Sequence, residues 1–197
     1  MKFDPKSDRG KYKLRKLTES AITVIGTKGF SEASVSEITR NAGVSYGLFY
    51  LYFKNKEDLL DELVKKYNHE LRYYLKSKTG SIADRIEMEK EGFKAFFVWV
   101  HSNMSFFRIL LEAQIHRPDI FRWHYTMLAE RYSIGLSKAM EEHSIKRTDP
   151  EVLAYTLMGI SDFLARKYVQ WDKHKIPPEV LKETYNLLER ILKPDNL

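Results

Sequence analysis

The chain of 197 residues is long enough for one or two domains, and its apolar content of 43% is sufficient for a sizeable core. It contains no cysteine, which excludes disulfides, thiolate metal sites and cysteine nucleophiles. The N-terminus lacks the apolar segment of a signal peptide, and the most apolar run, residues 95–100, is too short to span a bilayer. We therefore expect a soluble, cytoplasmic protein.

The net charge of +6 is concentrated near the N-terminus. Residues 1–56 contain eleven basic and five acidic side chains, whereas basic and acidic side chains balance in the rest of the chain. Such asymmetry is typical of a region that binds a polyanion. The alternative is a basic segment that only improves solubility.

Apolar residues recur at helical spacing along the chain, which predicts an all-α fold of about nine helices. The first helix is expected over residues 9–28 and is ended by Gly29. Ser34 begins the second helix with a capping box, in which its hydroxyl accepts a hydrogen bond from the Glu37 amide and the Glu37 carboxylate reaches back. Gly43 ends this helix.

A third, short helix is expected after Ser45, and Asn55 is expected to cap a fourth that runs to about residue 78. Prolines and capping residues then divide the chain into five further helices with short loops between them. Those helices are expected at about residues 81–103, 104–115, 118–142, 150–171 and 178–192.

The two short helices joined by Ala-Gly-Val-Ser predict a helix-turn-helix. In this motif the second helix enters the DNA major groove with its N-terminal residues. Phe49 and Phe53 are four residues apart and would anchor the short helix to the core. Tyr46 and Tyr50 occupy a neighbouring face, where their rings and hydroxyls could contact bases, and Gly47 between them would allow close approach.

Other side chains near the turn are suited to the DNA backbone. We expect Tyr52 and Lys56 to contact phosphates, and Ser34 and Ser36 to offer hydroxyls and amides at the start of the preceding helix. The alternative is that the tyrosines are half-buried packing residues in an ordinary helical corner.

Residues 14–60 resemble the DNA-binding domain of the TetR family of transcriptional regulators. The resemblance implies a helix-turn-helix DNA-binding domain with a basic arm over residues 1–56, and a helical-bundle ligand-binding and dimerisation domain over residues 57–197. The matching residues are Gly29-Phe30, Val35-Ser36-Glu37-Ile38, Ala42-Gly43-Val44-Ser45, Gly47, Tyr50, Phe53 and Lys56-Glu57-Asp58-Leu59-Leu60.

The resemblance further implies a homodimer that binds a palindromic operator in double-stranded DNA, usually as a repressor, and is released by a small-molecule effector. Tyr46 and Leu51 depart from the usual family pattern, which leaves the operator sequence open. The basic arm from Lys2 to Lys16 could add phosphate or minor-groove contacts. By position, the DNA-contacting residues would be Ser34, Ser36, Ser45, Tyr46, Gly47, Tyr50, Tyr52 and Lys56.

The segment 93–107 (FKAFFVWVHSNMSFF) is apolar on more than one helical face. Such a helix must bury more than one face, which permits an apolar cavity between helices. The alternative is ordinary core packing. The candidate effector-binding residues are Phe96, Trp99, Phe106, Phe107, Arg108, Phe121 and Trp123.

Arginines beside this aromatic segment suit an anionic head group. The run FRILLEAQIHRP over residues 107–118 is similar to TetR-type regulators of fatty-acid metabolism. A fatty acid or acyl-CoA is therefore the expected effector, and a cationic or neutral drug-like aromatic compound is the rival.

The last two expected helices carry wide apolar faces, which predict a four-helix bundle with a second copy of the chain. The alternative is that they only close the monomer core. The six histidines show no metal-ligand spacing, and no cofactor or catalytic motif is present, so we expect neither a metal site nor an enzyme. An all-α small-molecule binder or enzyme with an incidental basic N-terminus is the alternative class.

Overall fold

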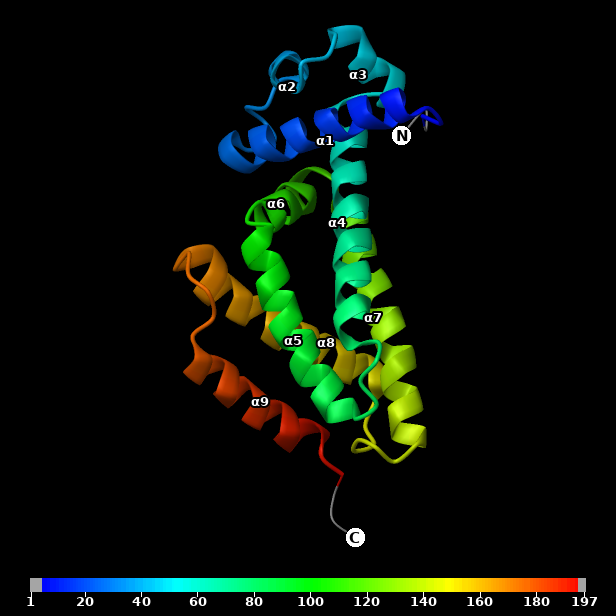
Figure 1. Ribbon diagram of the computed structural model, residues 1–197, viewed down its shortest axis with the longest axis vertical. Helices are drawn as coiled ribbons and strands as arrows, with labels where there is room; N and C mark the ends of the chain where they lie inside the picture. The colour runs from blue at the N-terminus through cyan, green and yellow to red at the C-terminus, as the bar shows by residue number, and fades with distance from the viewer. Residues whose placement is uncertain (1–4, 195–197) are drawn as a thin grey trace. The chain divides into compact units, whose positions relative to one another are not determined.

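The computed structural model describes residues 5–194, which form nine α-helices and one π-helical turn and contain no β-strand (Figure 1). The all-α fold expected from the helical periodicity is confirmed. In chain order the elements are α1 (Asp8–Lys28), α2 (Val35–Ala42), α3 (Tyr46–Tyr52), α4 (Lys56–Thr79), α5 (Arg85–Ser102), α6 (Phe106–His116), α7 (Pro118–Glu141), α8 (Pro150–Ala165), η1 (Arg166–Trp171) and α9 (Pro178–Leu192).

Capping groups determine where several helices begin. Asn55 caps α4 as expected, because its side-chain oxygen accepts a hydrogen bond of 2.8 Å from the Asp58 amide. Proline at the first position of α7, Pro118, also agrees with the sequence. α5 begins later than the expected residue 81, because the Asp84 carboxylate caps its first turn and the helix starts at Arg85.

The long helix expected over residues 150–171 is divided in two. α8 ends at Ala165, and the chain continues directly as the π-helical turn η1. The Asp172 amide donates to the Lys167 carbonyl, five residues earlier, at 3.1 Å. A π-helical turn admits one more residue per hydrogen-bonded loop than an α-helix, and helical periodicity alone does not reveal it.

The packing divides the chain into two compact units. The head unit contains the chain up to Asn68 together with Ser105–His124, so it holds α1, α2, α3, the first half of α4, α6 and the start of α7. The bundle unit contains His69–Met104 and the chain from Tyr125 onward. This grouping differs from the division at residue 56 expected from the sequence, because α6 packs against α1.

The head unit is held by an apolar core between α1, α2, α3, α4 and α6. α6 comes close to the end of α1 at Gly29, whose φ of 89° lies in the left-handed region. A Cβ atom at Gly29 would lie 2.5 Å from an Arg108 guanidinium nitrogen of α6. Buried side chains of this core include Leu17, Ala21, Val24, Ile25, Ile38, Phe49, Phe53, Leu59, Leu60, Leu63 and Val64.

The bundle unit is built around α5, which packs against α8, η1 and α9. A buried hydrogen-bond network joins α5 and α7 in this unit. Arg85 donates to the Glu89 carboxylate at 2.8 Å and to the Gly135 carbonyl at 3.0 Å. The Tyr132 hydroxyl also donates to Glu89. These bonds satisfy the buried carboxylate. Buried apolar side chains here include Phe93, Phe97, Val100, Leu136, Leu153, Ala154, Leu157, Leu188 and Leu192.

Candidate nucleic-acid interface

A tight turn joins α2 to α3. Ser34 starts α2 by accepting a hydrogen bond of 3.1 Å from the Glu37 amide, as the capping box predicted. The Glu37 carboxylate does not reach back, because Lys28 of α1 binds it at 2.6 Å. At the other end of α2, Gly43 adopts a φ of 66°, a conformation that favours glycine. The chain therefore reverses direction within a few residues before α3 begins.

The inner face of α3 anchors it in the head unit. Phe49 and Phe53 are fully buried, and Tyr52 is 2% exposed. The Tyr52 hydroxyl donates to the Gly10 carbonyl of α1 at 3.2 Å. We expected Tyr52 to contact phosphate, but the structure places it inside, where it fixes α3 against the start of α1.

The outer face of α3 is formed by Tyr46, Gly47 and Tyr50, which we call the tyrosine face. Tyr46 is 54% exposed and Tyr50 is 41% exposed. Their hydroxyl oxygens are 3.1 Å apart, and their ring centroids are 5.3 Å apart. A Cβ atom at Gly47 would meet no other atom within 4 Å. The two phenols therefore stand together on an open surface.

The hydrogen bond between the two hydroxyls also affects ionisation. It raises the pKa of Tyr50 above 10.0, and desolvation and the charge of Tyr46 act in the same direction. Tyr50 therefore stays neutral at physiological pH. Because one hydroxyl donates to the other, the pair together offers one remaining O–H donor and several acceptor lone pairs.

Lys56 binds within the head unit. Its ammonium group donates to the carbonyls of Phe30 at 2.5 Å and Ala33 at 2.8 Å, and lies 4.5 Å from the centre of the Phe30 ring. We expected this lysine to contact phosphate. In the structure it holds the loop between α1 and α2 against the first turn of α4. Ser36, in the first turn of α2, and Ser45, the N-cap of α3, are both exposed.

The sequence predicted a basic arm from Lys2 to Lys16 that could add contacts to DNA. Lys2 lies outside the described residues, whereas Lys6 and Arg9 are exposed. Tyr12 is 52% exposed, with the Arg15 guanidinium 5.4 Å from its ring centre. Because the Gly10 carbonyl binds Tyr52, this basic part of α1 adjoins α3. The long-range hydrogen bond was not visible in the sequence.

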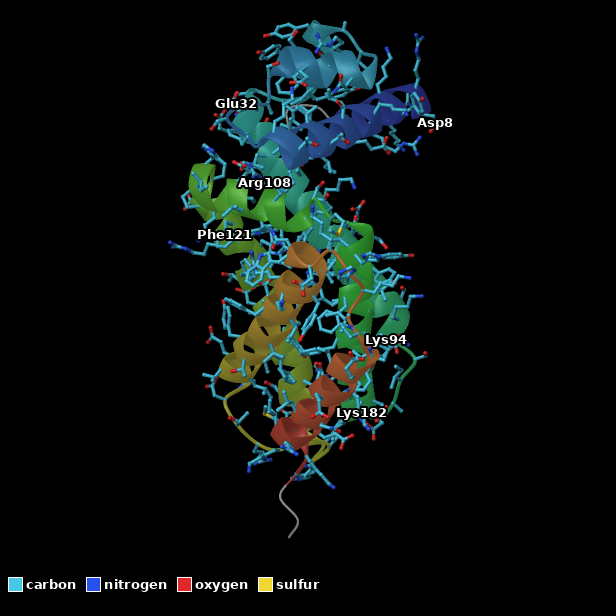
Figure 2. All side chains as sticks on the ribbon, turned by 90° about the vertical axis from the view of Figure 1, so that its left-hand side faces the viewer. Asp8, Glu32, Lys94, Arg108, Phe121 and Lys182 are labelled. Atoms are coloured by element: carbon cyan, nitrogen blue, oxygen red, sulfur yellow. The ribbon has the colours of Figure 1, made fainter. Side chains whose placement is uncertain are left out.

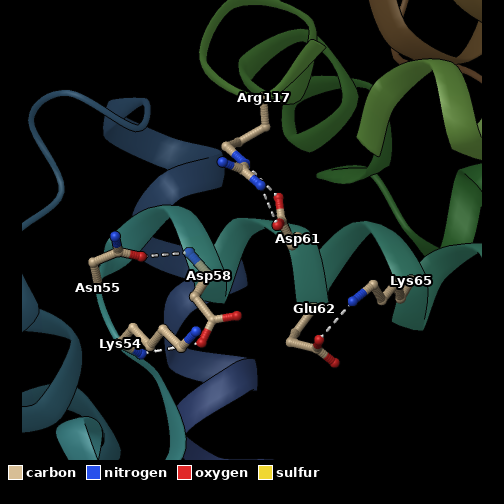
Figure 3. A network of polar contacts seen from close by, with 7 residues as sticks. All are labelled: Lys54, Asn55, Asp58, Asp61, Glu62, Lys65 and Arg117. Carbon is tan, nitrogen blue, oxygen red and sulfur yellow. Dashed lines mark hydrogen bonds and ion pairs between the residues drawn. The ribbon is translucent and has the colours of Figure 1, made fainter. Parts of the chain in front are cut away.

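The first turns of α4 are fixed by a network of polar contacts, shown in Figure 3. The Lys54 amide donates to the Asp58 carboxylate at 3.0 Å. One turn later, Arg117 forms a bidentate ion pair with Asp61, with contacts of 2.7 and 2.6 Å. This pair joins α4 to the junction between α6 and α7 inside the head unit. Bidentate pairs of this kind fix geometry as well as charge.

A second polar contact of the head unit is buried. The Asn68 side-chain amide donates to both the carbonyl and the Nδ1 atom of His124, each at 3.2 Å. His124 is 1% exposed, and burial lowers its pKa from 6.5 to about 4. The imidazole is therefore neutral at physiological pH, with Nδ1 as an acceptor.

The expected effector-binding residues fall into both units. Phe96 and Trp99 belong to the bundle unit, where Trp99 is 5% exposed. Arg108 does not present an uncommitted guanidinium, because its Nε atom binds the Glu112 carboxylate at 2.9 Å. Arg108 and Phe121 are labelled in Figure 2. The head unit contains the other five candidates, Phe106, Phe107, Arg108, Phe121 and Trp123.

Comparison with known proteins relates this geometry to a family. Residues 17–63 match the family described as bacterial regulatory proteins, tetR family. The fatty acid metabolism regulator protein of Bacillus subtilis is 44% identical over 82 residues, which are 42% of this chain and 36% of that protein. Over residues 17–63 this chain is therefore similar to regulators of the TetR family.

The TetR fold extends over nearly the whole chain. The fatty acid degradation regulator FadR from Bacillus halodurans has a TM-score of 0.81 at 22% identity, covering 94% of this chain and 96% of that one. FadR from Bacillus subtilis in complex with stearoyl-CoA has a TM-score of 0.76 at 21% identity, covering 89% and 97%. At these identities the likeness shows the fold.

The strong sequence match to TetR relatives is confined to part of their length. A second Bacillus subtilis regulator, YvdT, is 43% identical over 61 residues, which are 31% of this chain and 30% of that protein. The chain therefore matches about a third of the length of each of these two relatives. The family match includes every predicted DNA-contacting residue and none of the effector-binding candidates.

Two further findings concern the part of the chain that the structure describes. Every helix in residues 5–194 is too short or too polar to cross a lipid bilayer. Within the same residues, no three His, Asp or Glu side chains gather closely enough to hold a metal ion. The relatives are transcriptional regulators, not enzymes.

Proposed function

We propose that this TetR-family chain is a transcriptional regulator, most simply a repressor, that binds double-stranded operator DNA as a homodimer. The observation that carries the proposal is the tyrosine face on α3, which begins directly after the turn of a helix-turn-helix. A helix in this position enters the major groove. There the rings can contact thymine methyl groups and the free hydroxyl donor can reach a base edge or phosphate.

In this proposal the residues around α3 divide into two groups. Ser34, Ser36, Ser45 and the basic start of α1 contact the phosphates, which makes binding dependent on salt. Tyr52 and Lys56 act from within, by holding α3 and the α1–α2 loop in place. The second group sets the geometry of recognition without touching the DNA.

A palindromic operator requires two heads, and α8 supplies a surface for dimerisation. Its outward residues Val152, Tyr155, Gly159 and Phe163 follow helical spacing, and we call them the α8 face. Val152 is 63% exposed and Phe163 is 68% exposed. A Cβ atom at Gly159 would meet nothing within 4 Å. We propose that a second copy of the chain covers this apolar face, because large apolar side chains on a helix favour burial against a partner.

The proposed effector is an apolar or amphiphilic small molecule, with a fatty acyl-CoA as the best candidate. Support comes from the similarity to the Bacillus subtilis fatty acid metabolism regulator and from the fold shared with FadR in complex with stearoyl-CoA. Each unit contains buried aromatic side chains, such as Trp99 of α5 in the bundle unit and Phe107 of α6 in the head unit. A long acyl chain would bury well among such side chains.

The proposed coupling runs through α4. This helix belongs to the head unit as far as Asn68 and to the bundle unit from His69 onward. Effector binding in the bundle would shift α4, change the spacing of the two heads and lower operator affinity. Thermodynamic linkage requires that operator DNA weaken effector binding by the same factor.

A mobility-shift experiment on DNA from upstream of the chain's own gene tests the proposal. We expect a single shifted complex of two chains per fragment, whose affinity falls steeply with salt and which stearoyl-CoA dissociates. Tyr73→Ala is the matched control, because Tyr73 is 72% exposed in the bundle unit and should not affect DNA binding. Equal binding to any duplex, or no binding at low salt, would contradict the proposal.

A further inference from the structure

Two buried polar atoms of the bundle unit have no hydrogen-bond partner among residues 5–194: Nδ1 of His101 and Oε1 of Gln170. They are the only two such side-chain atoms in the described chain. His101 lies in the last turn of α5 and Gln170 lies in η1, and these two elements pack against each other. The two unsatisfied atoms therefore lie on neighbouring elements.

These atoms contrast with the other buried polar groups of the protein. The Glu89 carboxylate is bound by Arg85 and Tyr132, and the amide of Asn68 is bound to His124. A buried polar atom without a partner destabilises the folded state, because it loses its hydrogen bond to water and gains none. If His101 and Gln170 served only for packing, apolar side chains of the same size would make the folded state more stable.

Bulk solvent does not reach these two atoms. Both atoms are closed off from water in this conformation. Buried apolar residues directly precede both in the chain: Trp99 and Val100 come before His101, and Val169 comes before Gln170. A ligand that satisfied these atoms would need a polar group next to apolar parts.

The backbone of η1 is the second observation that points to a ligand. This segment is a π-helical turn in direct continuation of α8. π-helical turns are less stable than α-helix and occur frequently at functional sites. Arg166, the first residue of η1, forms an ion pair of 2.9 Å with Asp162 of α8. The turn carries Val169 and the Gln170 carboxamide oxygen to the inside together.

We propose that His101 Nδ1 and Gln170 Oε1 form a polar subsite for a neutral group that has one donor and one acceptor, a secondary amide or a hydroxyl, on an otherwise apolar effector. Gln170 Oε1 accepts the ligand's N–H or O–H, and His101 Nδ1–H donates to its oxygen. A carboxylate has no donor for Gln170. An effector reaches these atoms only when η1 moves away from α5. This inference rests on the effector response proposed above.

The test uses two probes that differ by a single donor: N-methyldodecanamide and N,N-dimethyldodecanamide. Tryptophan fluorescence of the full-length protein reports the dissociation constant of each. We expect the wild-type chain to bind the secondary amide about tenfold more tightly, because only that probe can donate to Gln170. In Gln170→Leu, or in Gln170→Met with its similar shape, this ratio should fall to about one.

His101→Phe should weaken both amides by a similar factor and leave their ratio intact, since both probes keep the carbonyl oxygen. Without ligand, the variants should melt at or above the wild-type temperature, because each loses an unsatisfied buried atom. Gln114→Leu, an exposed change in the head unit, is the matched control and should alter neither quantity.

The outcomes separate the subsite from the function on which it rests. A wild-type ratio of about one, or a ratio unchanged in both Gln170 variants, overturns the subsite. Binding of stearoyl-CoA without binding of either amide also overturns it and leaves the proposed function standing. If the wild-type chain binds neither stearoyl-CoA nor the amides, the proposed effector response fails and the subsite fails with it.

Discussion

α3 and α8 both expose aromatic side chains, but the chemistry of the two surfaces differs. On α3 the exposed rings of Tyr46 and Tyr50 end in hydroxyls that bind each other at 3.1 Å. On the α8 face the most exposed large apolar side chains are Val152 and Phe163, which have no polar atom, and Tyr155 between them is 43% exposed. A hydroxyl-tipped ring tolerates a wet, charged partner, whereas a purely apolar one gains most when water is excluded. The difference supports the proposed partners, which are DNA for α3 and a second copy of the chain for α8.

Both surfaces also contain a helical glycine with empty space around it. A Cβ atom at Gly47 or Gly159 would meet nothing within 4 Å. Glycine in a helix costs about 1 kcal/mol relative to alanine. Nothing in the chain's own packing requires a glycine at either position. The space is consistent with close approach by a partner at each surface.

The largest effect is expected from substitutions on the α8 face. In Tyr155→Glu/Phe163→Glu, two charges would be buried at the proposed interface, and we expect the chain to become a monomer. A monomer would bind the operator with one head unit in place of two, which should lower operator affinity by about 100-fold or more. Sedimentation velocity measures the first outcome and a mobility shift the second.

Ile134→Glu is the control for that experiment, because Ile134 is 71% exposed on α7 and lies outside the α8 face. It should remain dimeric. A double variant of α8 that stays dimeric would show that the α8 face is covered by something other than a second copy.

The next largest effect concerns the tyrosine face. We expect Tyr46→Ala/Tyr50→Ala to lose about 100-fold in operator affinity at fixed salt, since each lost base contact costs about 1–3 kcal/mol. The slope of affinity against salt should change little, because the tyrosines are not the charged contacts.

The hydroxyl pair makes a finer prediction. In Tyr46→Phe and Tyr50→Phe, each single change removes one partner of the same hydrogen bond, so the effects of the two changes should not add. Additive effects on operator binding would mean that the two hydroxyls act independently on the DNA.

The tyrosine face depends on a folded head unit, and the buried side chain of His124 should make the stability of that unit depend on pH. The pKa of His124 is about 4 in the folded chain, against 6.5 without burial. Between these values the unfolded chain binds a proton that the folded chain does not bind. Stability should therefore fall by about 1.4 kcal/mol per pH unit from this group as pH drops from 6.5 towards 4, with no further loss below.

Chemical denaturation at a series of pH values measures this slope. In His124→Gln, the slope of the free energy of unfolding against pH should be lower by about 1.4 kcal/mol per pH unit, which corresponds to one proton. The exposed change His174→Gln should leave it unaltered. An unchanged slope in His124→Gln would assign the acid sensitivity to other groups.

The smallest expected effect concerns the support of α4. Arg117→Ala removes the bidentate pair with Asp61, and the Arg117 side chain is 40% exposed, so solvent screens the interaction. We expect a loss of about 1 kcal/mol in the free energy of unfolding. Lys65→Ala removes only a more exposed pair with Glu62 and should cost less. Equal losses would show that the bidentate geometry adds nothing.

Short-range signals in the sequence were sufficient for much of the fold and for the tyrosine face. Asn55 and Pro118 mark helix starts through groups within a few residues of them, and Phe49 and Phe53 anchor α3 because four residues is about one helical turn. Exposure of Tyr50 follows from the same spacing.

Long-range partners account for what could not be predicted. Tyr52 is buried because its hydroxyl meets the Gly10 carbonyl, which is 42 residues away in the chain. Lys56 turns inward because three carbonyls of the α1–α2 loop accept hydrogen bonds from its ammonium group. Glu37 pairs with Lys28 instead of closing the capping box. No local pattern specifies which distant group will compete for such a side chain.

The two helical glycines have a consequence for engineering heat tolerance. Alanine at Gly47 or Gly159 would fit without collision and would strengthen its helix by about 1 kcal/mol. Alanine at these two positions would therefore stabilise the protein, but the added methyl groups would occupy the space proposed for DNA at α3 and for the second chain at α8. Selection for regulation would therefore keep both helices less stable than selection for thermal stability alone.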